Sequence, residues 1–269
     1  MKPFVILQLR PEKAAADNEF DAILKKSGLA QSEAVRIRLD REPIRAGFEL
    51  HDYAGVIVGG GPGCVSDPVD QKNEAERRIE DAILKLMPAI AAAYFPFLGC
   101  CYGIGILAHH LGAKVGKECY GEDVGAVECI LTTDGKSDPL VKDLPNKFMA
   151  FVGHKEAVQE LPEGCSLLLT SEPCPYQMIR YRNNIYATQF HPEADSRVFE
   201  LRINIYKDKG YFPPEEAEQL ITSCNGQHVH VPEAIGALPA RLGEFLDLVR
   251  LQGVPFPLAG VVGLPGPGL

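Results

Sequence analysis

Short apolar runs alternate with segments of helical periodicity along the first hundred residues of the chain. Four of these runs have the length and composition of buried strands, at residues 4–9, 35–39, 56–58 and 95–98. Two segments between them repeat apolar side chains at helical spacing, at residues 18–29 and 71–87. Because strands alternate with helices across short loops, we predict a parallel sheet with helices on both faces.

The pattern changes in the second half of the chain. From residue 124 to residue 190, short β-like runs are separated by turn signals such as Asp134-Gly135, Pro162-Glu163-Gly164 and Asn183-Asn184. We interpret this stretch as a small antiparallel edge subsheet that closes over a site. Helical patterns follow at 196–209, 214–223 and 239–252. The predicted fold class is therefore α/β, with a doubly wound, mostly parallel sheet, helices on both faces and a small antiparallel edge subsheet.

We expect one domain over residues 1–252 and a poorly ordered tail over residues 253–269. The tail holds five Gly and four Pro and carries no charge. The whole chain of 269 residues is 46% hydrophobic and 23% charged, as in ordinary globular proteins. Its formal net charge of −9 gives no electrostatic support for a nucleic-acid or anionic-membrane partner.

The eight cysteines do not form a disulfide or zinc pattern, because no C-x-x-C pair occurs. No apolar stretch approaches the roughly 18 residues of a membrane span. The apolar run at residues 4–9 is also too short for the apolar segment of a signal peptide. We therefore expect reduced thiols in a cytoplasmic protein.

One cysteine lies in a local sequence that presents a side chain. Cys101 is the central residue of Gly99-Cys100-Cys101-Tyr102-Gly103, where an apolar run meets a helical one. This is the G-x-nucleophile-x-G arrangement of a strained strand-to-helix turn, in which small flanking residues avoid steric conflict. The N-terminus of the following helix favours a thiolate at Cys101. We expect Cys100 to face the other way, into the core.

A general base for such a nucleophile is found ninety residues later. Residues 186–190 have the composition of a buried strand that stops at His191-Pro192-Glu193. A histidine and a carboxylate two positions apart can supply a base and the group that orients it. Cys101, His191 and Glu193 are therefore the predicted catalytic residues. The alternative, that Cys101 is simply a buried core cysteine, is weakened by the glycines around it and by the distant His-x-Glu.

Acyl chemistry also needs hydrogen-bond donors for a developing oxyanion. The loop Gly59-Gly60-Gly61-Pro62-Gly63 follows a predicted strand and offers backbone N–H groups without side chains. We predict that Gly60, Gly61 and the amide of Tyr102 serve this purpose. A phosphate-binding loop is the alternative, but Cys64 interrupts the G-x-G-x-x-G pattern.

Two further groups of side chains are candidate sites. Cys224 with His228 and His230 suggests a metal site, although the sequence offers no convincing fourth ligand. His109 and His110 are neighbours on a predicted helix, where adjacent residues diverge by about 100°. We expect both to lie on the helix surface.

The strand-to-helix turn at Cys101, the Gly-Gly-Pro loop and the His-Pro-Glu segment together resemble the class I glutamine amidotransferase family. This resemblance implies a flavodoxin-like fold. The branch that is most similar is the amidotransferase half of GMP synthase. Gly153-His154 and Pro175-Tyr176-Gln177 resemble further landmarks of the family. The resemblance implies that Cys101 attacks the side-chain amide of glutamine, while His191 moves the proton and Glu193 holds the imidazole. It also implies that His154 and Gln177 lie at the substrate, and that the reaction needs no metal or organic cofactor.

The sequence departs from the family at one position that bears on the substrate. The family places a substrate-binding glutamine where Gly105 stands. A pocket without that side chain is expected to lose a polar contact and to gain room for a larger γ-glutamyl compound. The alternatives to a glutaminase are therefore a stand-alone γ-glutamyl peptidase acting on glutathione-like compounds and a non-catalytic regulatory module. No synthetase signature is present, so a separate synthetase subunit would receive any ammonia.

Overall fold

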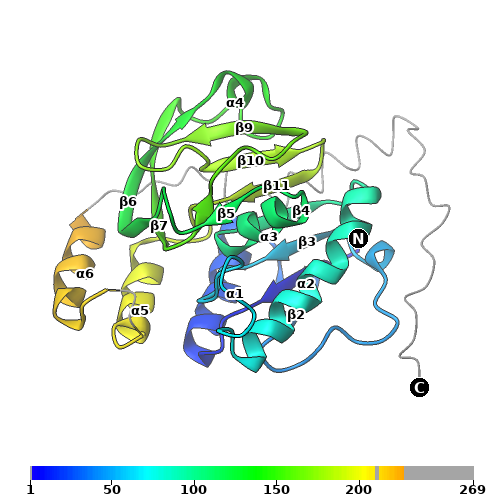
Figure 1. Cartoon of the computed structure of the whole chain (residues 1–269), viewed down its shortest axis with the longest axis horizontal. Helices are drawn as coiled ribbons and strands as arrows, with labels where there is room; N and C mark the ends of the chain where they lie inside the picture. The colour runs from blue at the N-terminus through cyan, green and yellow to red at the C-terminus, as the bar shows by residue number, and fades with distance from the viewer. Residues whose placement is uncertain (1, 210–211, 227–269) are drawn as a thin grey trace.

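The computed structural model describes residues 2–209 and 212–226 of the chain. Its centre is a nine-stranded sheet with the order β2-β1-β3-β4-β11-β10-β9-β6-β7 (Figure 1). The first five strands in this order pair in parallel. These parallel strands are β2 (Ala34–Arg38), β1 (Phe4–Gln8), β3 (Gly55–Val58), β4 (Phe97–Cys100) and β11 (Ile185–Thr188). Their arrangement confirms the parallel sheet predicted from the apolar runs.

The β-rich second half joins the sheet in the antiparallel sense. It adds β10 (Met178–Tyr181), β9 (Cys165–Thr170), β6 (Glu122–Leu131) and β7 (Lys147–His154) beyond β11. A separate two-stranded antiparallel sheet pairs β5 (Val115–Gly116) with β8 (Ala157–Val158). The fold class is therefore confirmed, but most of the antiparallel strands extend the main sheet because β10 pairs directly with β11.

Helices cover both faces of the sheet, because successive residues of each buried strand point to opposite sides. Val5 and Leu7 of β1 pack with α2 and α3, whereas Phe4 and Ile6 pack with α1. The α-helices are α1 (Lys13–Ser27), α2 (Glu74–Ala92), α3 (Tyr102–His110), α4 (Thr133–Ser137), α5 (Ser196–Tyr206) and α6 (Ala217–Gly226). Three short 3₁₀ turns complete the elements, η1 (Gln31–Glu33), η2 (Leu50–Asp52) and η3 (Pro214–Glu216).

Several element boundaries differ from the predictions. The turn signal at Asp134-Gly135 does separate β6 from β7, but these residues form the short helix α4, which Thr132 caps by accepting a hydrogen bond from the Gly135 amide at 3.0 Å. α2 extends beyond the predicted end at residue 87 and continues through Pro88, and the side chains of Met87 and Ile90 are both buried. The first helix begins five residues earlier than predicted, at Lys13.

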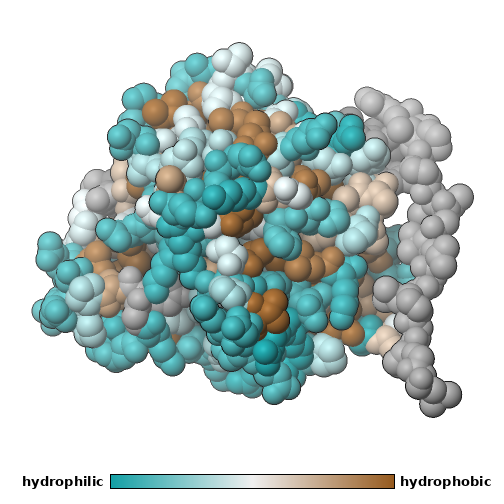
Figure 2. All heavy atoms as spheres, in the orientation of Figure 1, coloured by the Kyte–Doolittle hydropathy of each residue, from teal (hydrophilic) through white to brown (hydrophobic). Residues whose placement is uncertain are grey.

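Some predictions fall outside the described residues. These are the helix at 239–252, the Gly/Pro-rich tail and the histidines of the candidate metal site with Cys224. Among the described residues, none of the helices is both long and apolar enough to cross a membrane. The face in Figure 2 is largely hydrophilic, with small scattered apolar patches. His109 is exposed and His110 is partly exposed, in line with a position on the surface of α3.

Candidate active site

The strand-to-helix turn predicted around Cys101 is present between β4 and α3. Cys101 has φ 53° and ψ −93°, a conformation that is uncommon for a residue with a side chain. A Cβ atom on Gly99 would lie 2.8 Å from the backbone carbonyl of Gly103, so the turn is too tight for a side chain there. Cys100 is buried at the end of β4, as predicted, while Cys101 is partly exposed. The glycines therefore allow the turn that presents Cys101.

His191 follows β11 and is joined to the neighbouring elements by its backbone and its ring. Its amide donates to the carbonyl of Phe151 at 2.9 Å, and its Nδ1 lies 3.0 Å from Glu193 Oε1. The imidazole also packs edge-on against Phe199 of α5, with ring centroids 5.5 Å apart. The predicted pairing of a histidine with a carboxylate two residues later is thus present in a buried setting.

Parallel pairing of β4 with β11 brings the cysteine and the histidine together. The Cys101 amide donates to the carbonyl of Thr188 at 2.7 Å, three residues before His191. A Cβ atom placed on Gly60 would lie 3.7 Å from Cys101 Cβ and 2.8 Å from His191 Cε1. Both side chains line the same cavity. Residues that are ninety positions apart in sequence therefore meet at the end of two adjacent strands.

Arg202 completes the group and was missed by the sequence reasoning. It extends from α5, where its Nη2 lies 2.8 Å from Glu193 Oε1 and its Nη1 lies 3.2 Å from His191 Nδ1. Its position nine residues after Glu193, inside a predicted helix, was the only available signal. Arg202 is buried, so its charge acts on the His191–Glu193 pair with little screening by water.

The surroundings set the protonation of the three predicted catalytic groups. Loss of solvation raises the pKa of the Cys101 thiol to about 12, against the lowering effect of Arg10 and Arg202. Burial lowers the pKa of His191, although Glu193 opposes this. Burial by itself would raise the pKa of Glu193, but the charges of His191 and Arg202 hold it well below its usual range. These shifts therefore favour a neutral thiol beside a neutral imidazole over the expected thiolate.

The glycine-rich loop lies beside Cys101, but its amides are not equivalent. The Gly60 amide already donates to Glu19 Oε1 at 3.2 Å, so the prediction of Gly60 as an oxyanion donor needs correction. Gly61 and Tyr102 line the cavity at Cys101. The Glu19 carboxylate would repel a phosphate, which weakens the alternative reading of this loop. Gly61 and Tyr102 remain the better-placed pair of donors.

Two cavities meet at Cys101, and both are also lined by Gly61 and Gly153. One, of about 370 Å³, is called here the Tyr102 cavity; its walls include Tyr102, His154, Lys155, Glu156 and Gln189. The other, of about 480 Å³, is called the Arg10 cavity; its walls include Arg10, His191, Phe199, Arg202 and Phe212. Both volumes include space that is open to solvent.

The space beside Gly105 is filled, contrary to expectation. A Cβ atom on Gly105 would lie 2.9 Å from Glu156 Oε1. The missing glutamine side chain therefore does not leave extra room for a larger substrate, because a carboxylate from the β7–β8 connection takes its place.

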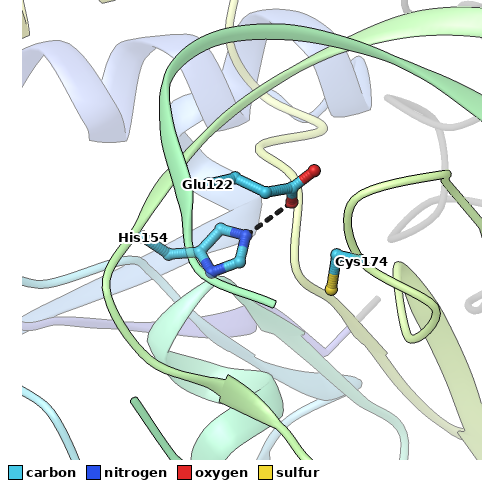
Figure 3. A group of neighbouring side chains, drawn as sticks. All are labelled: Glu122, His154 and Cys174. Carbon is cyan, nitrogen blue, oxygen red and sulfur yellow. Dashed lines mark hydrogen bonds and ion pairs between the residues drawn. The ribbon is translucent and has the colours of Figure 1, made fainter. Parts of the chain in front are cut away.

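The other two predicted substrate contacts belong to a buried hydrogen-bonded cluster (Figure 3). His154 lines the Tyr102 cavity, but its Nε2 lies 2.6 Å from Glu122 Oε2 and its Nδ1 lies 2.9 Å from the Glu156 carbonyl. Gln177 is fully buried, donates to Glu122 Oε2 at 2.7 Å and lines neither cavity. His154 therefore lies at the cavity beside Cys101, as expected, whereas a substrate contact by Gln177 gains no support from the geometry.

Cys174 lies in the same cluster, where one potential ligand atom each from Glu122, His154 and Cys174 falls within 4.8 Å of the others. Figure 3 shows the imidazole turned toward the carboxylate of Glu122. Glu122 Oε2 is already engaged by His154 Nε2 at 2.6 Å and by Gln177 Nε2 at 2.7 Å. The cluster is therefore best described as a hydrogen-bonded support beneath the Tyr102 cavity.

Comparison with known proteins agrees with this geometry. Residues 17–205 match the sequence profile of the family described as Glutamine amidotransferase class-I. A GMP synthase [glutamine-hydrolyzing] of Thermosipho melanesiensis is 32% identical over 152 residues, which are 51% of this chain and 29% of that protein. The corresponding enzyme of Thermosipho africanus is 35% identical over 147 residues, covering 54% of this chain and 25% of that protein. The chain thus spans less than a third of the length of these curated relatives.

Solved structures show the same fold. A glutamine amidotransferase from Thermotoga maritima superposes with a TM-score of 0.72 at 20% identity, covering 91% of this chain and 99% of that one. A glutamine amidotransferase from Methylobacillus flagellatus gives a TM-score of 0.62 at 20% identity, with 95% and 96% coverage. Because the profile match extends over more than half of the chain and the fold agrees, this protein belongs to the class-I glutamine amidotransferase family.

Proposed function

We propose that this domain hydrolyses the side-chain amide of glutamine through a γ-glutamyl thioester on Cys101. The observation that carries the proposal is the meeting of Cys101, on its strained turn, with a His191 that is hydrogen-bonded to Glu193. A nucleophile, a base and a group that orients the base are the parts that thiol-based acyl transfer needs.

The protonation states define the order of events. Because the pKa of Cys101 is raised and that of His191 is lowered, the resting pair is neutral. As the sulfur attacks the amide carbon, the thiol proton passes to His191, and Glu193 stabilises the imidazolium that forms. The imidazolium then gives this proton to the departing nitrogen, so that ammonia leaves and the thioester remains. Water, deprotonated by His191, attacks the thioester to release glutamate and restore the thiol.

The tetrahedral intermediate places a negative charge on the former amide oxygen. The amides of Gly61 and Tyr102 are our proposed donors, since both residues line the Tyr102 cavity and the Gly60 amide is engaged by Glu19. One such donor is typically worth about 10²–10³ in rate. The N-terminus of α3, which begins at Tyr102, adds a favourable dipole at the same point.

We further propose that the ammonia passes to a synthetase unit. The similar Thermosipho proteins are named as glutamine-hydrolysing GMP synthases and are about three to four times longer than their matched segment. By analogy, a synthetase unit would receive the ammonia from this domain. The small-molecule substrate would be bound without a metal or organic cofactor.

A γ-glutamyl peptidase is the second candidate, and the Arg10 cavity favours it. This cavity lies on the side of His191, the residue that would protonate the leaving nitrogen. Phe199 and Phe212 give it apolar walls beside the Arg10 guanidinium, a lining that ammonia alone does not require. A leaving amine that carries an apolar body and a carboxylate would fit such a lining.

The test compares ammonia and glutamate release from L-glutamine with dipeptide release from glutathione. Wild type, Cys101→Ala and the exposed-site control Glu163→Gln are assayed, with folding checked by thermal unfolding. We expect wild type and the control each to release as much ammonia as glutamate from L-glutamine. Cys101→Ala should release neither product. Dipeptide release with little ammonia would favour the peptidase. Failure of folded wild type to act on either compound, and of Cys101 to react with an electrophilic glutamine analogue, would refute the hydrolase and favour a non-catalytic module.

A further inference from the structure

The Glu156 carboxylate occupies the space beside Gly105 and lies at the wall of the Tyr102 cavity. Gly105 lies in α3, and its position allows the Glu156 carboxylate to approach the helix, since a Cβ there would lie 2.9 Å from Oε1. Glu156 is buried and lines the cavity, so its charge faces whatever binds beside Cys101. A buried carboxylate that lines a cavity is expected to have cationic or hydrogen-bond-donating partners.

Glu156 is held in place from two sides. Its Oε1 accepts from the Val65 amide at 3.0 Å and its Oε2 accepts from the Ser66 amide at 2.5 Å. Its backbone carbonyl lies 2.9 Å from Nδ1 of His154, which belongs to the buried cluster with Glu122. A carboxylate has about four lone-pair sites, so the two amides leave acceptor capacity on both oxygens. The carboxylate is therefore fixed but not saturated.

A second acceptor in the same cavity points to the same kind of ligand. Gln189 is only 2% exposed, and its Oε1 has no hydrogen-bond partner. It lines the Tyr102 cavity together with Glu156 and Cys101. A buried amide oxygen without a partner costs stability unless a ligand supplies a donor. The cavity wall thus combines a fixed negative charge with a buried amide oxygen that has no hydrogen-bond partner.

We propose that Glu156 and Gln189 bind the ammonium group of an amino-acid-type substrate in the Tyr102 cavity. Glu156 would then determine specificity, because it brings a charge where an amide side chain on α3 would be neutral. This proposal rests on the proposed hydrolysis, since it assigns the acyl half of the substrate to that cavity. Lys155 lines the same cavity and brings a positive charge for the carboxylate of an amino-acid zwitterion.

The test measures equilibrium binding by titration calorimetry in the Cys101→Ala background, so that no probe is consumed. The probes are L-glutamine, 4-aminobutanamide, which lacks the carboxylate, and glutaramate, which lacks the ammonium group. We expect Glu156→Gln to weaken binding of the two ammonium-bearing probes about tenfold or more. Glutaramate binding should change by no more than about twofold, because it offers no charged donor to residue 156.

Two controls separate recognition from a purely structural role. Glu156→Gln keeps the size of the side chain and one carbonyl acceptor for the loop amides, and its fold is checked by thermal unfolding. Glu163→Gln, at an exposed position, should leave all three affinities unchanged. Equal weakening of the three probes, or no binding of the ammonium-bearing probes to Cys101→Ala, would overturn the proposal. Because binding is measured without turnover, an inactive wild type would refute only the hydrolase.

Discussion

Replacing Arg202 with Met is expected to destabilise the protein and to disturb its proposed base. Arg202 is buried, and its Nη2 lies 2.8 Å from Glu193 Oε1 and 4.0 Å from Glu19 Oε1. Breaking a buried ion pair typically costs about 3–5 kcal/mol, because the remaining charge is left without its partner. We expect the free energy of unfolding to fall by about 3 kcal/mol, at the low end of this range. Glu193 remains paired with His191, and Glu19 remains paired with Arg10.

This cost converts into a measurable shift of the melting temperature. For a domain of this size, 1 kcal/mol corresponds to about 2–4 °C, so Arg202→Met should melt about 6–12 °C below wild type. Scanning calorimetry or circular dichroism measures the shift. Arg197→Met is the matched control, because Arg197 is exposed on the same helix, and it should melt within about 2 °C of wild type.

The pH dependence gives the destabilisation a specific origin. The pKa of Glu193 is depressed in the folded protein, partly by Arg202, so this stabilisation is present at neutral pH and is lost as pH falls through the depressed pKa. The difference in melting temperature between wild type and Arg202→Met should therefore shrink as pH falls below about 4. Arg202 also lowers the pKa of His191, so its loss should move the acid limb of activity to higher pH. An unchanged melting temperature and acid limb would refute this account of Arg202.

Three other predictions concern Cys101 and its loop. Cys101→Gly should abolish turnover yet melt above Cys101→Ala, because glycine relieves the positive φ, a strain of about 1–3 kcal/mol; equal melting temperatures would argue against strain. The rate of iodoacetamide labelling of Cys101, followed by peptide mass spectrometry, should rise about tenfold per pH unit from about pH 7 to pH 10, because its thiol has a pKa of about 12. A labelling rate that reaches a plateau below about pH 8 would show a resting thiolate instead. Gly60→Ala should lower kcat by about 10² or more, because its Cβ would lie 2.8 Å from His191 Cε1. The control Gly63→Ala should keep a kcat close to that of wild type, because its Cβ would meet no atom nearer than 3.5 Å. Similar kcat values for the two variants would contradict that geometry.

Some features followed from short stretches of sequence because their causes are local. The glycines around Cys101 predicted a tight turn, and the structure shows why, since Gly99 approaches the Gly103 carbonyl too closely for a side chain. The spacing of His191 and Glu193 after a buried strand predicted their hydrogen bond. The alternation of strands and helices predicted the parallel sheet that brings Cys101 near His191.

Other predictions failed where one segment competes with another for the same atoms or space. The Gly60 amide looked available in the loop sequence, but Glu19 from α1 accepts its hydrogen bond. Gly105 was expected to leave extra room for the substrate, but the Glu156 carboxylate occupies the space beside it. His154 lines the Tyr102 cavity as expected, but its two ring nitrogens already face Glu122 and the Glu156 carbonyl. None of these partners is near in sequence to the residue that it engages, apart from Glu156 and His154.

The sequence by itself determined the turn at Cys101, the pairing of His191 with Glu193 and the parallel sheet, because each depends on local backbone geometry or on periodic burial. Only the tertiary structure decided the charges around them. Arg202 reaches Glu193 because α5 packs with that side toward the site, and Glu156 reaches the loop amides because the β7–β8 connection folds over α3. The strength of a charge depends on its distance and on the exclusion of water, and both are set when distant segments pack.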